Sequence, residues 1–301
     1  MGLPLGHARH QGPVIAGLGR VALAALAQRF DRGPRGAFEV PSPEHRARVP
    51  ARDRQMVDDY VRWCGGDPAS WRGRLPPHLF PQWGFPLLGR TLAGIPYPIA
   101  RVLNGGCRME IRGDLPAGEP LDLTARLVRV DEDARRAILH QELVTSVGGV
   151  DLLVAQVQGV VPLSKGKDEQ RSKKSPVLVP TDAREIGWWR LAPDAGLAFA
   201  CLTGDFNPVH WIRPYARASG FKGTILHGFA TLGRALEALQ RVCWAGDTRR
   251  LRTVEVRFTR PLLLPARVGC YLRGHEIFVG DAPGAPAYLQ GTFEVKDETH
   301  E

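Results

Sequence analysis

The chain has 301 residues, a length that suits one large domain or two of about 150 residues. Hydrophobic residues make up 44% of it, which is ample for buried cores. The formal net charge is +9, but the arginines are scattered and no dense basic run is interleaved with aromatic residues, which argues against a nucleic-acid-binding protein.

The cysteines indicate the redox environment. There are five, they lie far apart, and no two have CxxC spacing. We therefore expect a reduced, cytoplasmic location without a structural metal. The residues are Cys64, Cys107, Cys201, Cys243 and Cys270.

Residues 1–40 are interpreted as an N-terminal extension. The apolar run 13–27 contains Arg20, so we predict an amphipathic helix, with a signal peptide as the alternative left open. The side chains expected on its apolar face are Ile15, Leu18, Ala22, Ala25 and Leu26. No run reaches about 18 uninterrupted apolar residues, so no membrane span is expected.

Residues 41–163 are predicted to be one structural unit. In residues 76–94, Pro81 and Pro86 interrupt an apolar segment, which predicts a short or kinked helix. Alternating or continuous apolar patterns then predict strands over 121–130, 136–147 and 151–163, arranged as an antiparallel meander.

A polar segment separates this unit from a second one. Residues 164–175 have no large apolar side chain and five basic ones, so 164–180 is interpreted as a linker. Residues 109–127 align without gaps with 254–272 and share five identities, which indicates an internal duplication. The shared pairs are Glu110 with Glu255, Arg112 with Arg257, Pro116 with Pro261, Pro120 with Pro265, and Leu127 with Leu272.

The second unit, residues 181–301, shows a helix followed by strands. Residues 228–243 carry an apolar stripe at helical spacing, formed by Phe229, Leu232, Leu236, Leu239 and Cys243. Alternation over 253–258 and the patterns at 267–278 and 287–296 predict strands. A long helix followed by an antiparallel sheet is an α+β arrangement.

The stretch 201–210, CLTGDFNPVH, gathers unusual polar residues. Pro208 keeps Asn207 out of the helical conformation and Gly204 permits a sharp turn, so Asp205, Asn207 and His210 can converge. A carboxylate beside an imidazole forms a general acid–base pair. The alternative is a turn in which Asp205 caps the next helix and His210 packs under Trp211.

The start of the predicted long helix offers a second chemical group. Gly228 opens it, and an unblocked main-chain N–H at a helix N-terminus attracts negative charge. This amide is suited to stabilise an oxygen that becomes an oxyanion, and a glycine lets a ligand approach closely. The alternative is an ordinary helix start with His227 packed beside it.

Residues 199–216, FACLTGDFNPVHWIRPYA, together with ILHGFATLG at 225–233, resemble the MaoC-like hydratases and dehydratases, which include the R-specific enoyl-CoA hydratases. The likeness is close over about 185–300 and weaker over about 45–163. It implies a double hot dog, in which two helix-wrapped antiparallel sheets share one chain.

The resemblance also implies chemistry and roles. Asp205 and His210 would activate water and exchange the α proton, Asn207 would place the water, and the Gly228 amide would hold the thioester oxygen. The reaction would be reversible hydration of trans-2-enoyl thioesters, with dehydration of (3R)-hydroxyacyl thioesters as its reverse. It needs no metal or other cofactor. The implied partners are acyl-CoA first, acyl carrier protein second, and a second copy of the chain as a homodimer.

The first unit departs from the family pattern. It keeps Asp67 and His78 but has no Asn-Pro-x-His, so neither residue is expected to be catalytic, and one active site is expected at the junction of the units. Arg213, Arg217, Lys222 and Arg234 could meet CoA phosphates or form a solvated face. Two alternatives to the hydratase stay open, a hot-dog acyl-CoA thioesterase and a non-catalytic acyl-CoA-binding protein.

Overall fold

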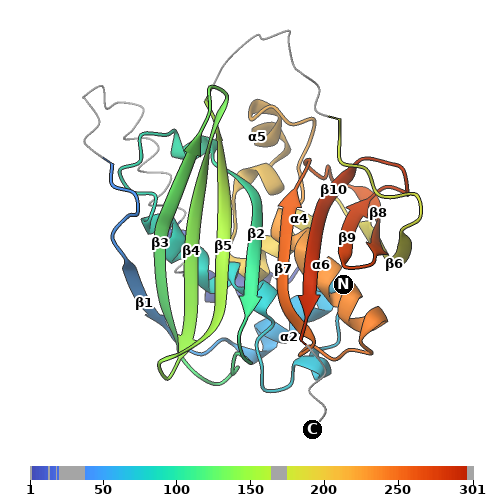
Figure 1. The fold of residues 1–301 in the computed structure, drawn as a ribbon, viewed down its shortest axis with the longest axis horizontal. Coiled ribbons are helices and arrows are strands. Elements are labelled where there is room, and N and C mark those ends of the chain that lie inside the picture. The colour runs from blue at the N-terminus through green and yellow to red at the C-terminus, as the bar shows by residue number, and fades with distance from the viewer. Residues whose placement is uncertain (1, 13, 18, 20–37, 164–174, 297–301) are drawn as a thin grey trace.

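The computed structural model describes residues 2–12, 14–17, 19, 38–163 and 175–296. Its centre is one ten-stranded sheet in the order β1-β3-β4-β5-β2-β7-β10-β9-β8-β6, with every neighbouring pair antiparallel (Figure 1). The strands of the first half are β1 (His45–Val49), β2 (Leu103–Ile111), β3 (Leu121–Glu132), β4 (Arg136–Val147) and β5 (Val150–Pro162). Those of the second half are β6 (Arg184–Leu191), β7 (Leu251–Phe258), β8 (Ala266–Arg273), β9 (Glu276–Gly280) and β10 (Ala287–Val295).

The two halves join through β2 and β7, which pair with Met109 opposite Val254. The gapless alignment of 109–127 with 254–272 equates these same two residues. It also equates the first residue of β3, Leu121, with the first residue of β8, Ala266. A duplicated unit that meets its copy about a local two-fold axis produces this register, so the structure supports the predicted duplication.

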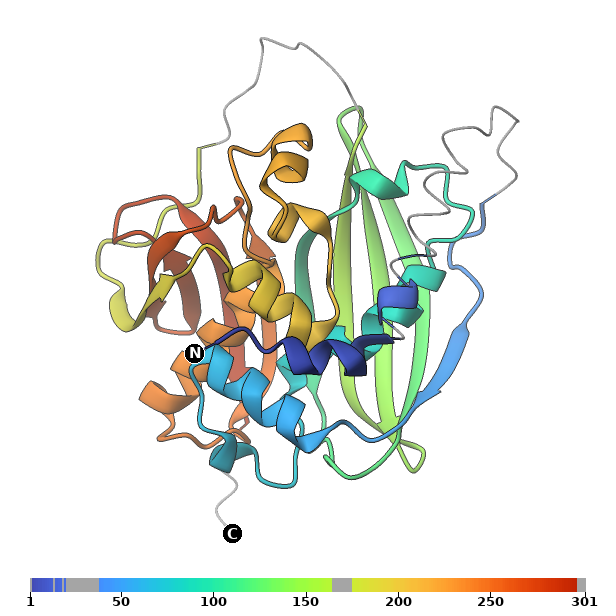
Figure 2. The same cartoon turned by 180° about the vertical axis from the view of Figure 1, so that it is seen from behind.

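Helices cover one face of the sheet, the face toward the viewer in Figure 2. They are α2 (Arg54–Cys64), α3 (Pro81–Arg90), α4 (Ala195–Thr203), α5 (Arg213–Ala218) and α6 (Gly228–Cys243), with the short 3-10 turns η1 (Leu5–Gln11), η2 (Pro68–Trp71), η3 (Pro77–Leu79), η4 (Ile99–Arg101) and η5 (Pro208–His210). The predicted helix at 228–243 is confirmed with the same bounds, and its stripe is buried from Phe229 to Leu239. The helix of the first half is confirmed as short, ten residues with Pro86 inside it.

The main hydrophobic core lies between the helices and the sheet and contains residues of both halves. A buried polar contact also joins the halves there. Glu237 of α6, in the second half, accepts hydrogen bonds from the indole of Trp71 (2.9 Å) and lies 3.1 Å from Nε2 of His78, both in the first half. Breaking a buried pair of this kind leaves an uncompensated polar group, so this contact helps to hold the halves in one arrangement.

The N-terminal segment is anchored across both halves. The buried amide of Gln11 donates to the carbonyls of Cys201 (3.2 Å) and Leu202 (3.0 Å) at the end of α4, and its oxygen accepts from Gln82 of α3 (3.1 Å). Residues 14–17 are helical, as predicted, but the expected inward face is wrong at Ile15, which is 44% exposed. Val14 is buried instead. The other residues of the predicted apolar face, Leu18, Ala22, Ala25 and Leu26, lie outside the described residues.

The predicted linker is too long at its second end. Val179 is fully buried in a small cluster with Ala183, Tyr271 and Phe278, and its N–H donates to Ala285 (2.9 Å). Residues 164–174, the polar part, lie outside the described residues. The description as a linker is therefore wrong for the end of the 164–180 range, because apolar Val177 and Val179 pack on the sheet.

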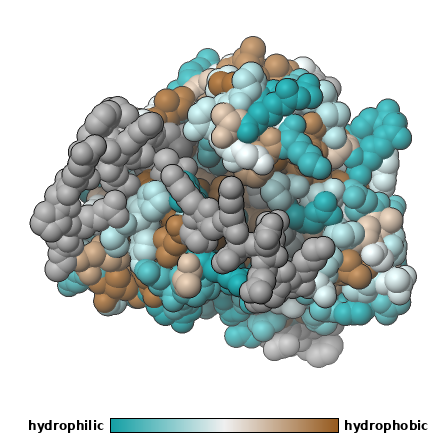
Figure 3. All heavy atoms as spheres, turned by 90° about the horizontal axis from the view of Figure 1, so that it is seen from above, coloured by the Kyte–Doolittle hydropathy of each residue, from teal (hydrophilic) through white to brown (hydrophobic). Residues whose placement is uncertain are grey.

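The surface mixes residue types. Viewed from above, hydrophilic and hydrophobic residues of the described chain are interspersed (Figure 3). All five cysteines are free thiols, and four of them are buried. None of the helices in the described ranges combines the length and the hydropathy that a membrane span requires.

Candidate active site

The polar cluster follows directly from the end of α4. Gly204 caps this helix in the left-handed conformation (φ 82°), and its N–H donates to Ala200 (2.7 Å). A side chain at this position would also collide with Val14, since an added Cβ would lie 2.5 Å from the Cβ of Val14. Asn207 then takes a non-helical conformation (φ −56°, ψ 121°) before Pro208, as the sequence predicts. The chain thus reverses sharply between α4 and η5.

This reversal brings Asp205 and His210 together with a third residue, His227. One ligand atom from each of the three side chains lies within 4.8 Å of the other two. His227 Nε2 lies 2.8 Å from the main-chain oxygen of Asp205 and 3.8 Å from its carboxylate. His210 is 9% exposed and the Asp205 side chain 14%, so the group is buried but not sealed. The predicted convergence of carboxylate and imidazole is present in the structure.

The tautomer of His210 follows from its hydrogen bond. Nδ1 lies 2.9 Å from the carbonyl oxygen of Ile225 and must donate to it, because a carbonyl oxygen only accepts. Neutral His210 therefore carries a free lone pair on Nε2, and no described residue makes a hydrogen bond to that atom. Burial lowers the pKa of His210, although the nearby Asp205 charge opposes the shift. At neutral pH the ring is an unprotonated base.

His227 is the site residue that the sequence did not identify. Its ring is 2% exposed and stacks on His210, and its Nε2–H donates to Asp205. Burial holds the pKa of His227 well below its usual range, and repulsion from His210 adds to the shift. A neutral ring locked in this way positions both His210 and Asp205. The sequence signal for His227 is its position directly before Gly228, where the sequence analysis considers it only as a residue packed beside a helix start.

Gly228 occupies the first position of α6, after His227, which provides no side-chain cap. Its N–H has no acceptor within the helix and makes no hydrogen bond to a described residue. The predicted donor is therefore available, on a residue that is partly accessible. The predicted reason for a glycine is incomplete, however. An added Cβ would lie 2.6 Å from the ring of Phe258, so Phe258, rather than ligand approach alone, demands glycine here.

Asn207 mainly shapes the turn. Its side-chain oxygen accepts from the N–H of Val209, and its own N–H donates to the Asp205 carboxylate, both at 3.3 Å. Its side-chain nitrogen makes no hydrogen bond to a described residue. The alternative that packs His210 under Trp211 is wrong, because Trp211 is 40% exposed and donates to Phe206.

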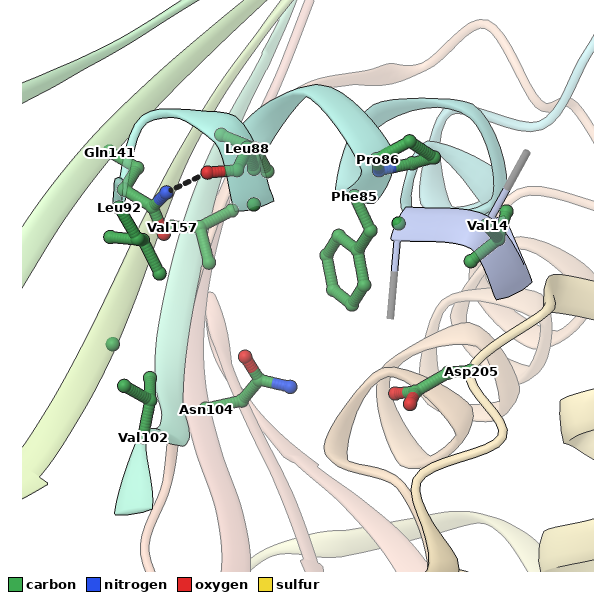
Figure 4. A pocket seen from close by; sticks show the side chains of 13 residues that line it. Val14, Phe85, Pro86, Leu88, Leu92, Val102, Asn104, Gln141, Val157 and Asp205 are labelled. Carbon is green, nitrogen blue, oxygen red and sulfur yellow. Dashed lines mark hydrogen bonds between the residues drawn. The ribbon is translucent and has the colours of Figure 1, made fainter. Parts of the chain in front are cut away.

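A pocket of about 130 Å³ opens beside Asp205, and most of its lining comes from the first half (Figure 4). Phe85 of α3 points into it, Leu92 and Val102 lie on the side opposite Asp205, and the Asn104 side chain points toward the carboxylate. The side-chain amide nitrogen of Gln141, also in the pocket wall, donates a hydrogen bond to the carbonyl of Leu88 (2.7 Å). An apolar pocket that ends at a carboxylate fits an apolar chain attached to a reacting group.

Asp67 and His78 of the first half, which are not expected to be catalytic, lie away from this cluster. Asp67 is exposed and caps η2 through Ala69 (2.9 Å). His78 is buried with Tyr60 and Glu237. Among the basic residues near the motif, Arg213, Arg217 and Lys222 are exposed, and Arg234 lines a different cavity.

Two groups of described residues have spacing that a metal ion could bridge, Asp205 with His210 and His227, and His7 with His10 and Asp53. In the first group, His227 Nε2 and His210 Nδ1 already face main-chain carbonyls as donors. Those two nitrogens cannot ligate while they carry these protons, whereas His210 Nε2 and His227 Nδ1 keep their lone pairs.

Comparisons with known proteins agree with the motif. The family model for the MaoC like domain matches residues 170–278. Peroxisomal enoyl-CoA hydratase 2 of Arabidopsis thaliana is 26% identical over 190 residues, 56% of this chain and 59% of that protein. The 3-hydroxyacyl-thioester dehydratase X of Mycobacterium tuberculosis is 32% identical over 143 residues, 46% of this chain and 48% of that protein. The chain thus matches less than two thirds of either relative.

Solved structures share the fold over most of the chain. The crystal structure of HtdX from Mycobacterium tuberculosis has a TM-score of 0.68 and 20% identity, covering 84% of this chain and 99% of that one. A second protein from the same organism, described as having a double hotdog fold, has a TM-score of 0.58 and 13% identity, covering 86% of this chain and 96% of that one. The predicted α+β double hot dog is confirmed.

Proposed function

Because residues 170–278 belong to the MaoC-like domain family, we propose that this protein adds water reversibly to trans-2-enoyl thioesters, giving (3R)-hydroxyacyl thioesters. The observation that carries the proposal is the free lone pair of His210 Nε2 beside the Asp205 carboxylate. The unpaired amide of Gly228 follows His227, whose ring contacts both residues. These are the base, the charge and the oxyanion donor that addition to a conjugated thioester requires.

The groups suggest a sequence of proton movements. The thioester oxygen accepts a hydrogen bond from Gly228, which polarises the double bond toward the carbonyl. His210 Nε2 takes a proton from a water molecule while the water oxygen bonds to C3. The Asp205 carboxylate stabilises the resulting imidazolium. The enolate then collapses as His210 returns a proton to C2 on the same face. One water has been added, and the side chains end in their starting states.

The pocket supports a thioester with an apolar acyl chain. Apart from Val14, its apolar side chains come from the half that lacks the motif, on α3, on β5 and at Leu92 and Val102, which leaves that half free to hold the chain. We propose a coenzyme A thioester as substrate first, and an acyl carrier protein thioester second. The chemistry described uses side chains, one amide and water, so we propose that no cofactor takes part. A homodimer and a cytoplasmic location remain proposals.

The thioesterase alternative shares the fold. An acyl-ACP thioesterase from Bacteroides thetaiotaomicron has a TM-score of 0.52 at 11% identity, covering 84% of this chain and 98% of that one. What favours the hydratase is His210, whose lone pair lies beside Asp205, because a base paired with a carboxylate provides for adding and returning a proton.

One assay separates these activities. The purified chain is incubated with short, medium and branched trans-2-enoyl-CoA and, separately, with (3R)-hydroxyacyl-CoA, while enoyl absorbance and free thiol are followed together. With enoyl-CoA we expect enoyl absorbance to fall without release of thiol. With (3R)-hydroxyacyl-CoA we expect enoyl absorbance to appear. Thiol release with constant enoyl absorbance would indicate a thioesterase. The absence of both signals would support the non-catalytic acyl-CoA-binding alternative.

A further inference from the structure

A second cavity, of about 490 Å³, lies on the helical side of the molecule. Its walls come from α2, α4, α6, the end of β6 and residues 2–4, and in Figure 2 the start of the chain lies beside the light-blue helix α2. It shares no lining residue with the pocket beside Asp205. Much of its wall is apolar, including Trp63, Ala195, Ala198 and Leu202.

Arg234 of α6 is a half-buried cation that lines this cavity. Its guanidinium carbon lies 4.2 Å from the centre of the Trp63 ring, and its Nε is buried with no hydrogen-bond partner. Among the described residues, no carboxylate forms an ion pair with the Arg234 guanidinium. Burial lowers the pKa of Arg234. A charge that is partly removed from water and has no ion-pair partner among the described residues favours the binding of an anion.

The other charged residues of the cavity wall do not pair with Arg234. The Asp59 carboxylate is shared by Arg62 (2.7 Å) and His7 (2.8 Å). Arg190 is exposed at the cavity and forms no ion pair with a described residue, whereas Asp194 is exposed on the same rim. The cavity lining therefore carries three arginines and two aspartates, and Arg234 is the arginine that packs on the apolar wall.

The cavity is separated from the proposed catalytic group by Phe199. This buried ring lies between Trp63, which lines the cavity, and His227, with ring centroids 5.2 Å and 4.9 Å away. Leu202, which also lines it, is buried at the last turn of α4. A ligand in this cavity would therefore not contact Asp205 or His210.

We propose that this cavity is a second ligand site, which binds a small organic anion with an apolar tail. Arg234 contacts the anionic head, either a carboxylate or a phosphate monoester, since a guanidinium matches both geometries. The tail lies against Trp63, Ala198 and Leu202. The volume is within the range of small-molecule sites.

The test uses octanoate, octyl phosphate and octanol as probes, with binding to the full chain measured by calorimetry. We expect at least one of the two anions to bind, with the better one identifying the preferred head, and octanol to bind at least tenfold more weakly. Arg234→Met keeps the apolar stem and is expected to weaken anion binding at least tenfold. Arg267→Met, the same change at an exposed residue of β8, is expected to have no effect.

Two further variants distinguish the cavities. Ala198→Leu fills the cavity without changing charge and is expected to weaken anion binding, and far-UV circular dichroism confirms that each variant is folded. Leu92→Trp fills the pocket beside Asp205 and is expected to leave this binding unchanged. Equal anion affinity in the wild type and Arg234→Met, octanol bound as tightly as the anions, or loss of binding only in Leu92→Trp would each overturn the proposal.

Discussion

The rings of His210 and His227 are stacked, with centroids 3.5 Å apart and planes 25° from parallel. Each ring also donates one N–H to a main-chain oxygen, His210 to Ile225 and His227 to Asp205. Two protonated imidazoles in this position would repel each other in a buried space. The arrangement therefore depends on neutral rings and couples both the proposed activity and the stability to pH.

The first prediction concerns the pH dependence of turnover. Burial lowers the pKa of His210, so the base stays unprotonated below the ordinary histidine value of about 6.5. We expect kcat/KM for enoyl-CoA hydration to hold down to pH 6.5 and to fall only at lower pH. Asp205 raises the pKa of His210, so the residual activity of Asp205→Asn should fall at still lower pH. An acid limb above pH 6.5, or the same limb in both proteins, would contradict the assignment of His210 as the base.

The second prediction concerns stability. Both folded-state pKa values are lowered, so the unfolded chain binds protons first as the pH falls. The free energy of unfolding should be full above pH 6.5 and decrease as the pH drops below it. Urea unfolding from pH 7.5 to 5 measures this. In His227→Gln, whose side chain does not titrate, the decrease should be smaller, and an equal slope in both proteins would show that His227 does not contribute.

The third prediction concerns the motif. Asp205→Asn and His210→Ala should each lower the rate of hydration by roughly a hundred- to ten-thousandfold, because acid–base catalysis contributes about that much. Circular dichroism and the unfolding midpoint should show that both variants fold. Asp67→Asn is the matched control, since Asp67 follows a glycine as Asp205 does but is exposed and caps η2. Full activity of either motif variant would reject the assigned site.

Features that depend on residues close together in the sequence were predictable, and features that depend on distant residues were not. The turn at Gly204 and Pro208 and the stripe of α6 depend on residues close in sequence, and both were predicted correctly. The role of His227 depends on contacts with Asp205 and His210 across the turn, and the need for glycine at 228 depends on Phe258, thirty residues away. The contact of His78 with Glu237 spans 159 residues. Periodicity reports which face of an element is buried, but it does not identify the partner.

The predictions for the end of the linker and for the N-terminal segment were incomplete for the same reason. Val179 is a short apolar residue at the end of a polar run, and its burial requires Tyr271 and Phe278 of the second half. Gln11 is polar in sequence yet fully buried, because the last carbonyls of α4 need donors. Neither requirement is visible in the local sequence.

The fourth prediction concerns Gly228. An added Cβ would lie 2.6 Å from Phe258, so Gly228→Ala should destabilise the fold by about 1–3 kcal/mol, as overpacking does, and lower activity. Phe258→Leu in the same chain removes the obstacle and should restore part of the unfolding free energy. Urea unfolding of the single and double variants measures the coupling. Strictly additive effects would show that the two positions do not interact.

The fifth prediction concerns the length of the acyl chain. Leu92 lies across the pocket from Asp205, so Leu92→Trp should shorten the space without touching the reacting end (Figure 4). Each buried methylene contributes about 0.8 kcal/mol, so excluding two of them should lower kcat/KM for long enoyl-CoA substrates by roughly tenfold. Turnover of a four-carbon substrate in the same variant is the internal control and should be unchanged. Val150→Trp, at a residue that is 60% exposed, controls for adding an indole. An equal loss for short and long substrates would mean that the acyl chain does not occupy this pocket.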